Sequence, residues 1–446
     1  MDSTEKLKGT HLEEQRIGMI YLNLFKRRLE GFKDGLFPKG FKRSPALPIS
    51  VILLVIVLPI ATWKLHRLGR FSQIKREIKG ETQGPPVVGP RPGGVDPIVL
   101  TRNQTAGSNM PEFRSATLLP GLGMQVLQIT AFIPSRGEVE LLAAPSVKDV
   151  ADGTTPNRSG VNDTRGALEA PWSGLLVGLL TPVGTSVRTS WRGKTIEAPA
   201  VVPGRSTAES GLLVGQGADS TELTPQGNPT VASATFKATD FDQHWTSKND
   251  FSVSATLGAT TIDLDITVKN VGEQPEPMGM GWHPRFLIPS GSRDTAEIRL
   301  PIGELLEIAD VAKGVPSGRF VAAGSAISRF QQHPWPIGAE SVDGGLVYLK
   351  PNLMEKGVSA EVRDPKSEFG LRLTAVSDNM RELRVTSPSG SNYVSLGMQS
   401  NLDDPFGKEW SGNDSASIGE LLPGQTAEWK VRLEIFSIAN HTTGNR

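Results

Sequence analysis

The feature that most constrains the fold is an alternation of apolar and polar residues with a period of two. Residues 251–257 and 261–270 each place an apolar side chain at every second position, with Gly258 between the two runs. Such alternation is typical of half-buried β-strands, and a glycine between two alternating runs predicts a hairpin. The same alternation recurs in residues 358–362, 371–375 and 429–435.

The rest of the chain beyond residue 110 fits the same architecture. No long segment there has a convincing helical period, and no repeat of 20–50 residues is visible. The chain holds 48 glycines and 33 prolines, which suits a protein with many turns. A series of short strands separated by turns predicts one large antiparallel β-sandwich over residues 110–438, with hardly any helix.

Charge is distributed unevenly along the neutral chain of 446 residues. Residues 1–80 contain 16 Lys/Arg and 7 Asp/Glu, a net charge of +9, so the remainder carries −9. A basic end followed by an acidic globule favours contact with anionic lipid over nucleic-acid binding. The acidic part has no basic patch with interleaved aromatic residues, so no nucleic-acid partner is expected. The chain has no cysteine, which excludes disulfides and thiol nucleophiles.

Residues 47–63 form an uncharged, strongly apolar run of 17 residues with basic residues on both sides. This length is at the lower end of what spans a bilayer, about 17–25 residues. An uncleaved, single-pass membrane anchor is predicted, with the short N-terminal arm inside and the large domain outside. The alternative is a buried core segment. The predicted organisation is an arm (1–46), a transmembrane helix (47–63), a Pro/Gly-rich linker (64–109), the β-sandwich (110–438) and a tail (439–446).

A histidine stands at a junction between a strand and a loop, in the stretch Met278-Gly-Met-Gly-Trp-His-Pro-Arg-Phe286. Pro275 and Pro277 end the strand that precedes it, because proline cannot continue a hydrogen-bonded ladder. His283 is therefore delivered where working side chains are common. On this local pattern alone, a packed structural histidine is the favoured interpretation. Trp282 beside it is suited to stack on a sugar face or to be buried in the core.

The stretch around His283 resembles the Gly-Trp-His-Pro-Tyr-Phe signature of the aldose 1-epimerase (galactose mutarotase-like) family. Looser landmarks follow in family order within residues 112–124, 137–142, 179–188, 342–344 and 394–399. The resemblance implies an all-β supersandwich that interconverts sugar anomers, with His283 as the general acid. It also implies that Arg188, Asp343 and Gln399 contact the sugar. A surface arginine and a turn-capping aspartate are the alternatives for the first two.

The sequence departs from the family pattern at the residues that carry the reaction. Gly397 stands where the family has its catalytic glutamate, and a second family histidine aligns near Ser210-Gly211. Arg285 replaces the aromatic residue that follows His-Pro. Asp403, Asp404 and Glu409 are candidate substitute bases, with a solvated acidic turn as the alternative. If the base is lost and the loop accepts a side chain at residue 397, Gly397→Glu is expected to raise activity.

Two functions from different classes therefore remain open. One is an aldose 1-epimerase-like isomerase that acts on a monosaccharide or a sugar unit of a glycan. The other is a membrane-tethered module that binds carbohydrate without turnover. No residue spacing indicates a metal site, a Ser-His-Asp triad or a phosphate loop, so no cofactor or metal is expected. The sequence does not determine the oligomeric state.

Overall fold

The computed structural model describes residues 89–438, except 104, 106–108, 154–165, 178–179, 201–205, 225–229, 352–356 and 411–416. Every pair of strands in its sheets is antiparallel, which agrees with the predicted all-β architecture. The predicted arm (1–46), membrane helix (47–63) and tail (439–446) lie outside the described residues, and these three boundaries stay predictions.

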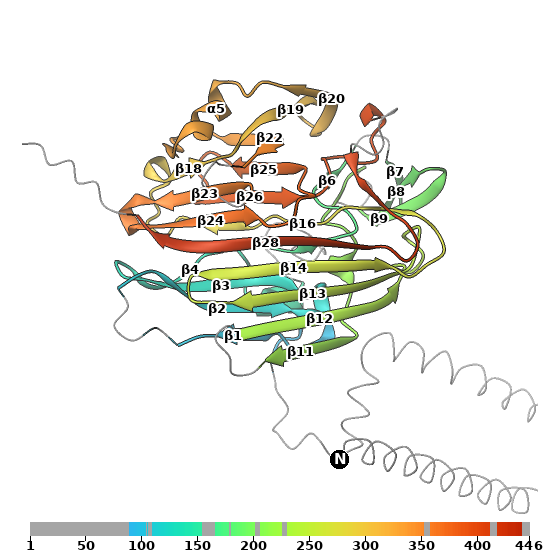
Figure 1. The fold of residues 1–446 in the computed structure, drawn as a ribbon, viewed down its shortest axis with the longest axis horizontal. Coiled ribbons are helices and arrows are strands. Elements are labelled where there is room, and N and C mark those ends of the chain that lie inside the picture. Colours follow the sequence, from blue (N-terminus) through green and yellow to red (C-terminus); the bar gives the residue numbers. More distant parts are fainter. Residues whose placement is uncertain are drawn as a thin grey trace, which may run out of the picture. The chain divides into compact units, whose positions relative to one another are not determined.

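The largest sheet within the described residues has nine strands, and the C-terminal strand lies in its interior. Its strands, in order across the sheet, are β11 (Ser220–Thr224), β12 (Thr230–Thr239), β13 (Asn249–Leu257), β14 (Thr261–Asn270), β28 (Thr426–Ser437), β24 (Phe369–Ala375), β23 (Ser359–Asp364), β18 (Glu297–Arg299) and β21 (Trp335–Pro336). Figure 1 shows β28 between β14 and β24, so the last strand joins segments that are far apart in the sequence.

The predicted strands of this sheet are confirmed. Residues 251–257 and 261–270 form the hairpin β13–β14, and Leu257 pairs with Ile262. Gly258 N–H donates to the Thr261 carbonyl at 2.8 Å in the turn. The runs at 358–362, 371–375 and 429–435 fall on β23, β24 and β28. In β13, β14 and β28 the side chains alternate between buried and more exposed positions, whereas β23 and β24 are largely buried on both faces.

A second large sheet, of eight strands in the described part of the chain, carries the site. In order these are β20 (Val315–Val321), β19 (Ile302–Asp310), β22 (Val342–Lys350), β25 (Glu382–Ser387), β26 (Tyr393–Gln399), β16 (Gly281–Trp282) and β5 (Leu168–Glu169), and β17 (Arg285–Leu287) also pairs with β26. One core cluster packs residues of both large sheets together, among them Trp282, Leu264 and Trp429, which are all buried. The two sheets therefore form a sandwich around one core.

Smaller sheets complete the strand inventory of the described residues. They are β1 (Ile98–Thr101), β2 (Glu112–Leu119), β3 (Gln125–Ile133) and β4 (Gly137–Glu140) in one sheet; β7 (Thr181–Val183), β8 (Ser186–Trp191) and β9 (Lys194–Pro199) in another; and the pairs β6 (Leu175–Leu176) with β10 (Ala208–Glu209) and β15 (Glu276–Met278) with β27 (Gly419–Leu421). Because β1 pairs with β2, the sheet structure begins ahead of residue 110, inside the segment predicted to be linker. This long-range pairing has no local signature.

Helices are few and short in the described part, as predicted. They are α4 (Val147–Asp152) and α5 (Ser325–Gln332), with 3-10 turns at Pro92–Gly94, Pro120–Leu122, Leu213–Gly215, Arg293–Thr295, Pro365–Ser367 and Lys408–Trp410. Ser146 caps α4 by accepting a hydrogen bond from Asp149 N–H, and Asp149 accepts from Ser146 N–H in return.

Among the helices that the structure describes, none is both long and apolar enough to span a bilayer.

Candidate functional site

Four neighbouring strands of the eight-stranded sheet present a polar row to one face. Glu382 of β25 pairs with Gln399 of β26. Gln399 also pairs with Gly281 of β16, which in turn pairs with Glu169 of β5. Opposed residues on paired strands share a face, and so do residues two apart along one strand. Two further rows on this face follow from the register: Arg384 with Gly397, and Thr386 with Ser395 and Arg285.

The opposite face of the same strands is apolar. Its residues alternate with the polar ones and are all buried: Leu168, Trp282, Leu383, Val385, Leu396 and Met398. Each strand therefore packs one side against the core and offers the other side to a site. The alternation seen in residues 382–387 and 393–399 is the local reason for this arrangement.

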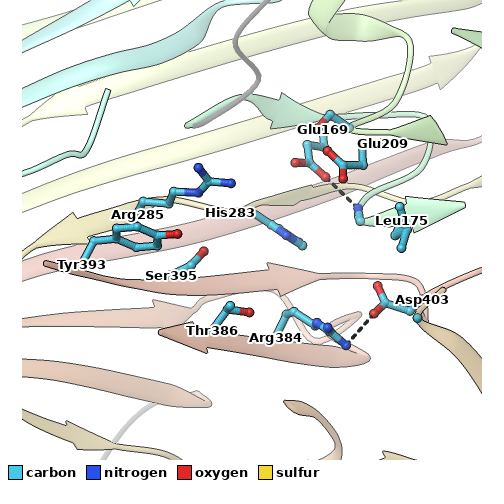
Figure 2. Close-up of a pocket in the computed structure, with 13 residues that line it drawn as sticks. Glu169, Leu175, Glu209, His283, Arg285, Arg384, Thr386, Tyr393, Ser395 and Asp403 are labelled. Atoms are coloured by element: carbon cyan, nitrogen blue, oxygen red, sulfur yellow. Dashed lines mark hydrogen bonds and ion pairs between the residues drawn. The ribbon is translucent and has the colours of Figure 1, made fainter. Parts of the chain in front are cut away.

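A pocket of about 240 Å³ lies over the polar face (Figure 2). Charged, hydroxyl and small residues dominate its lining, which consists of Glu169, Gly174, Leu175, Glu209, Ser210, His283, Arg285, Gly314, Arg384, Thr386, Tyr393, Ser395 and Asp403. Sites for drug-sized ligands are typically about 300–1,000 Å³ and mostly apolar. This smaller, polar pocket suits a single ring that carries hydroxyl groups.

The His283 imidazole projects into the pocket from the turn between β16 and β17. Its Nε2 lies 2.8 Å from Gln399 Oε1 and 3.3 Å from Ser173 Oγ. The ring packs on the backbone of Gly397: a Cβ at that position would come within 2.7–2.8 Å of three ring atoms. The histidine therefore occupies the space that a side chain at residue 397 would take.

The Gln399 amide determines which imidazole nitrogen carries the proton. Its Nε2 donates to Glu382 Oε2 at 3.1 Å and to Asp403 Oδ1 at 3.3 Å. With the NH₂ group directed at two carboxyl groups, Oε1 faces His283 and needs a donor. His283 Nε2–H supplies it, so the neutral imidazole is the Nε2-protonated tautomer.

The carboxyl groups below His283 are strongly coupled. Burial raises the pKa of Glu382 well above its usual range, and the neighbouring Asp403 carboxylate raises it further. Arg384 donates to Asp403 Oδ2 at 2.9 Å and to Asp343 Oδ1 at 3.1 Å. The Asp403 carboxylate raises the pKa of Arg384, which stays a cation. Arg384 therefore balances the charge of Asp403, while burial favours the protonated form of Glu382.

Two of the residues predicted to contact a sugar lie away from the pocket. Trp282 is fully buried on the apolar face, where its indole N–H donates to the Gly166 carbonyl at 3.0 Å. It packs edge-on against Phe286, so it cannot stack on a ligand in this pocket. Arg188 lies on β8 in a different sheet and donates to Glu197 at 2.9 Å on an exposed surface. The face to which its strand turns decides the position of Trp282, and the sheet to which its strand belongs decides that of Arg188. Neither is a local property of the sequence.

Three other predicted residues come together. His283 lines the pocket, Gln399 is buried beneath it, and Asp343 holds Arg384 from the outer side. Asp343 is itself exposed, and it contacts a pocket residue without lining the pocket. Ser210, where the family resemblance places a lost histidine, also lines the pocket and adopts a positive φ of 70°.

Of the substitute bases considered from the sequence, only Asp403 lines the pocket. Asp404 accepts a hydrogen bond from Val177 N–H at 2.9 Å, and burial raises its pKa to about 8. Burial also raises the pKa of Glu409. These two carboxyl groups are part of a packed loop and do not reach the pocket.

The expectation that Gly397→Glu raises activity required room for a side chain at residue 397, and the structure does not provide that room. Even a Cβ at residue 397 would overlap the His283 ring, which would have to leave its place between Gln399 and Ser173. Placing a glutamate there would thus displace the proposed acid. Because Gly397 has no side chain, the His283 ring can lie against its backbone, and the same ring leaves no room for a glutamate at residue 397.

Sequence reasoning missed several pocket residues, among them Glu169, Arg384, Thr386 and Ser395. The last three had a signal, because they are the polar members of two alternating strands. Glu169 had none, since only its pairing with β16 brings it to the site. Within the described residues, no cluster of three or more His, Asp or Glu side chains is arranged to hold a metal ion.

Comparison with known proteins finds similarity in structure alone. No protein-family model matches the chain. No curated protein matches it. Solved structures do match the chain.

A galactose mutarotase-like protein from Clostridium acetobutylicum has a TM-score of 0.59 at 15% sequence identity, and the match covers 77% of this chain and 99% of that one. A GalM/aldose epimerase homologue from C. elegans has a TM-score of 0.56 at 12% identity, over 77% and 99% of the two chains. Galactose 1-epimerase from Lactobacillus acidophilus has a TM-score of 0.50 at 11% identity, over 77% and 99%. At these identities the likeness establishes the architecture: the chain has the β-rich fold of galactose mutarotase-like proteins.

Proposed function

We propose that the chain binds an aldose or a terminal sugar unit and interconverts its anomers, with His283 as the general acid. The observation that carries this proposal is the position of His283 in a polar pocket of about 240 Å³ on the hydroxyl-lined face of β25, β26 and β16. The fold is shared with solved structures described as galactose mutarotase-like and as galactose 1-epimerase, which supports the substrate class.

Anomer interconversion needs only proton transfers at a sugar hemiacetal. A base takes the proton of the C1 hydroxyl, and an acid protonates the ring oxygen as the C1–ring oxygen bond breaks. Rotation about the C1–C2 bond and reversal of both transfers give the other anomer. Each positioned proton-transfer group typically contributes about 10²–10⁴-fold. His283 is anchored by Gln399 and Ser173, so its ring is held in place before a substrate arrives.

The second candidate is a module that binds carbohydrate without turnover. The observation that favours it is Gly397, which stands where the family that this sequence resembles has its catalytic base. The His283 ring leaves no room for a base side chain there. Under this candidate the same residues recognise the sugar, and His283 donates hydrogen bonds without transferring a proton. The two candidates differ in whether anomer exchange is accelerated.

The test is exchange NMR between the α- and β-anomer H1 signals of a panel of aldoses, with and without a free 6-hydroxyl, in the presence of the full-length chain. We expect acceleration over the spontaneous rate for at least one sugar and a loss of 10²-fold or more in His283→Ala. His333→Ala removes an exposed histidine outside the pocket and serves as the matched control. Saturation-transfer contact with a sugar but no acceleration would support the binding module, and neither signal would remove both candidates.

Membrane attachment through residues 47–63 is a separate part of the proposal. It is supported by 17 uncharged residues between basic flanks, a composition that suits a bilayer span and anionic headgroups. In this arrangement the large domain faces outward from the cytoplasm and acts on sugars near the membrane surface.

A further inference from the structure

The proposed reaction needs a base that residue 397 cannot supply, and three carboxyl groups line the pocket. They belong to Glu169, Glu209 and Asp403. Both oxygens of Asp403 are already engaged, Oδ1 by Gln399 at 3.3 Å and Oδ2 by Arg384 at 2.9 Å. Each of its oxygens is held by one donor in the floor of the site. Asp403 is therefore a positioning group, and the base has to be sought elsewhere in the pocket.

The Glu169 carboxylate is joined to the His283 imidazole through one hydroxyl group. Glu169 Oε2 accepts from Ser173 Oγ at 2.9 Å and from Gly174 N–H at 2.7 Å. Ser173 Oγ lies 3.3 Å from His283 Nε2. Both hydrogen bonds fall on Oε2, so Oε1 has no partner among the described residues, and the residue lines the pocket. A carboxylate oxygen is thus held beside the acid and open to a ligand.

Two glycines make this geometry possible. Gly281 lies between Glu169 and Gln399 in the sheet, and a Cβ there would come within 2.2 Å of Ser173 Oγ. Gly174 has a φ of 77°, and a Cβ there would come within 2.7 Å of Asp403. The bare backbone at both positions lets the Ser173–Gly174 turn fit between the two carboxyl groups. The link from base to acid is therefore built into the turn that follows β5.

We infer that Glu169 is the general base that replaces the glutamate missing at residue 397. This inference rests on the proposed anomer interconversion. The Glu169 carboxylate takes the proton of the C1 hydroxyl, and the electron pair of that O–H bond forms the carbonyl as the C1–ring oxygen bond breaks. His283 acts as the imidazolium: it gives its Nδ1 proton to the departing ring oxygen and keeps Nε2–H on Gln399 Oε1. After rotation about C1–C2, both protons return by the same path and the other anomer leaves.

The experiment is the kinetic analysis of Glu169→Gln in the full-length chain, with folding checked by circular dichroism. We expect kcat to fall by about 10²–10⁴-fold with KM within a few-fold of wild type, because the base acts on the transition state. The acidic limb of the pH dependence of kcat/KM, which reports the base, should disappear. Glu140→Gln makes the same chemical change on an exposed position of β4 and should leave the rate unchanged.

Glu169→Asp gives a second measurement in case the amide variant does not fold. It keeps the charge but withdraws the carboxylate by one methylene, and we expect at least a tenfold loss of kcat. A folded Glu169 variant with wild-type kcat would overturn the inference, while continued loss of activity in His283→Ala would leave the proposed function standing. No acceleration by the wild-type chain would overturn both.

Discussion

Gly397→Ala would test the steric relation between β26 and His283. In an exposed strand, replacing a glycine interior to the strand with alanine stabilises a protein by about 0.5–1 kcal/mol, because the unfolded chain loses fewer conformations. At residue 397 the new Cβ would lie 2.7–2.8 Å from three atoms of the His283 ring. The sign of the effect should therefore reverse.

The expected destabilisation follows from what the imidazole must do. Overpacking of this kind costs about 1–3 kcal/mol. If the ring moves aside, it also loses the hydrogen bond to Gln399, now 2.8 Å long, which is worth about 0.5–1.5 kcal/mol. After the gain from the glycine replacement is subtracted, we expect Gly397→Ala to lower the free energy of unfolding by roughly 1–3 kcal/mol.

Urea unfolding of the full-length chain, together with the imidazole NMR signals of His283, measures both consequences. Gly215→Ala is the matched control, since it lies on an exposed turn with no atom within 4 Å of the new Cβ. It should be neutral or slightly stabilising. A Gly397→Ala variant as stable as wild type, with unshifted His283 signals, would refute the proposed packing of the ring.

Other features of the structure lead to three further predictions. Arg384→Met leaves Asp403 without its cation and should cost about 3–5 kcal/mol in urea unfolding, whereas Arg432→Met at an exposed ion pair should cost under about 1 kcal/mol; equal losses would contradict this. Burial raises the pKa of Glu276 to about 8. The protonated carboxyl therefore contributes its full stabilisation below the ordinary carboxyl pKa, and this stabilisation is lost as the pH rises through about 8. The free energy of unfolding should therefore fall less from pH 5 to pH 8 in Glu276→Gln than in wild type, and an unchanged slope would count against the buried acid. Deleting residues 47–63 should release the chain from the membrane fraction, and a wild-type chain that is already in the soluble fraction would show that the anchor is wrong.

Local sequence was sufficient for the strands with clear alternation, whereas the candidate site residue His283 was found through the family resemblance of its stretch. The alternation in residues 251–257 and 261–270 specified a hairpin, because side-chain direction in a strand depends only on position along the chain. The Trp-His-Pro stretch led to His283, which the structure places in the pocket. Gly397 was recognised as a departure from the family pattern on the same basis, although its steric consequence was not.

Strand register and sheet order decided the rest, and neither is written in any local segment. Glu169 reaches the site only because β5 pairs with β16 across more than a hundred residues, and the same pairing turns Trp282 toward the core. Arg188 was assigned to the site by resemblance, yet its strand belongs to another sheet. A shift of register by one residue would send every side chain of a strand to the opposite face. The sequence by itself thus determined that the chain forms strands and which residues alternate, while the tertiary structure decided which alternating faces meet around His283.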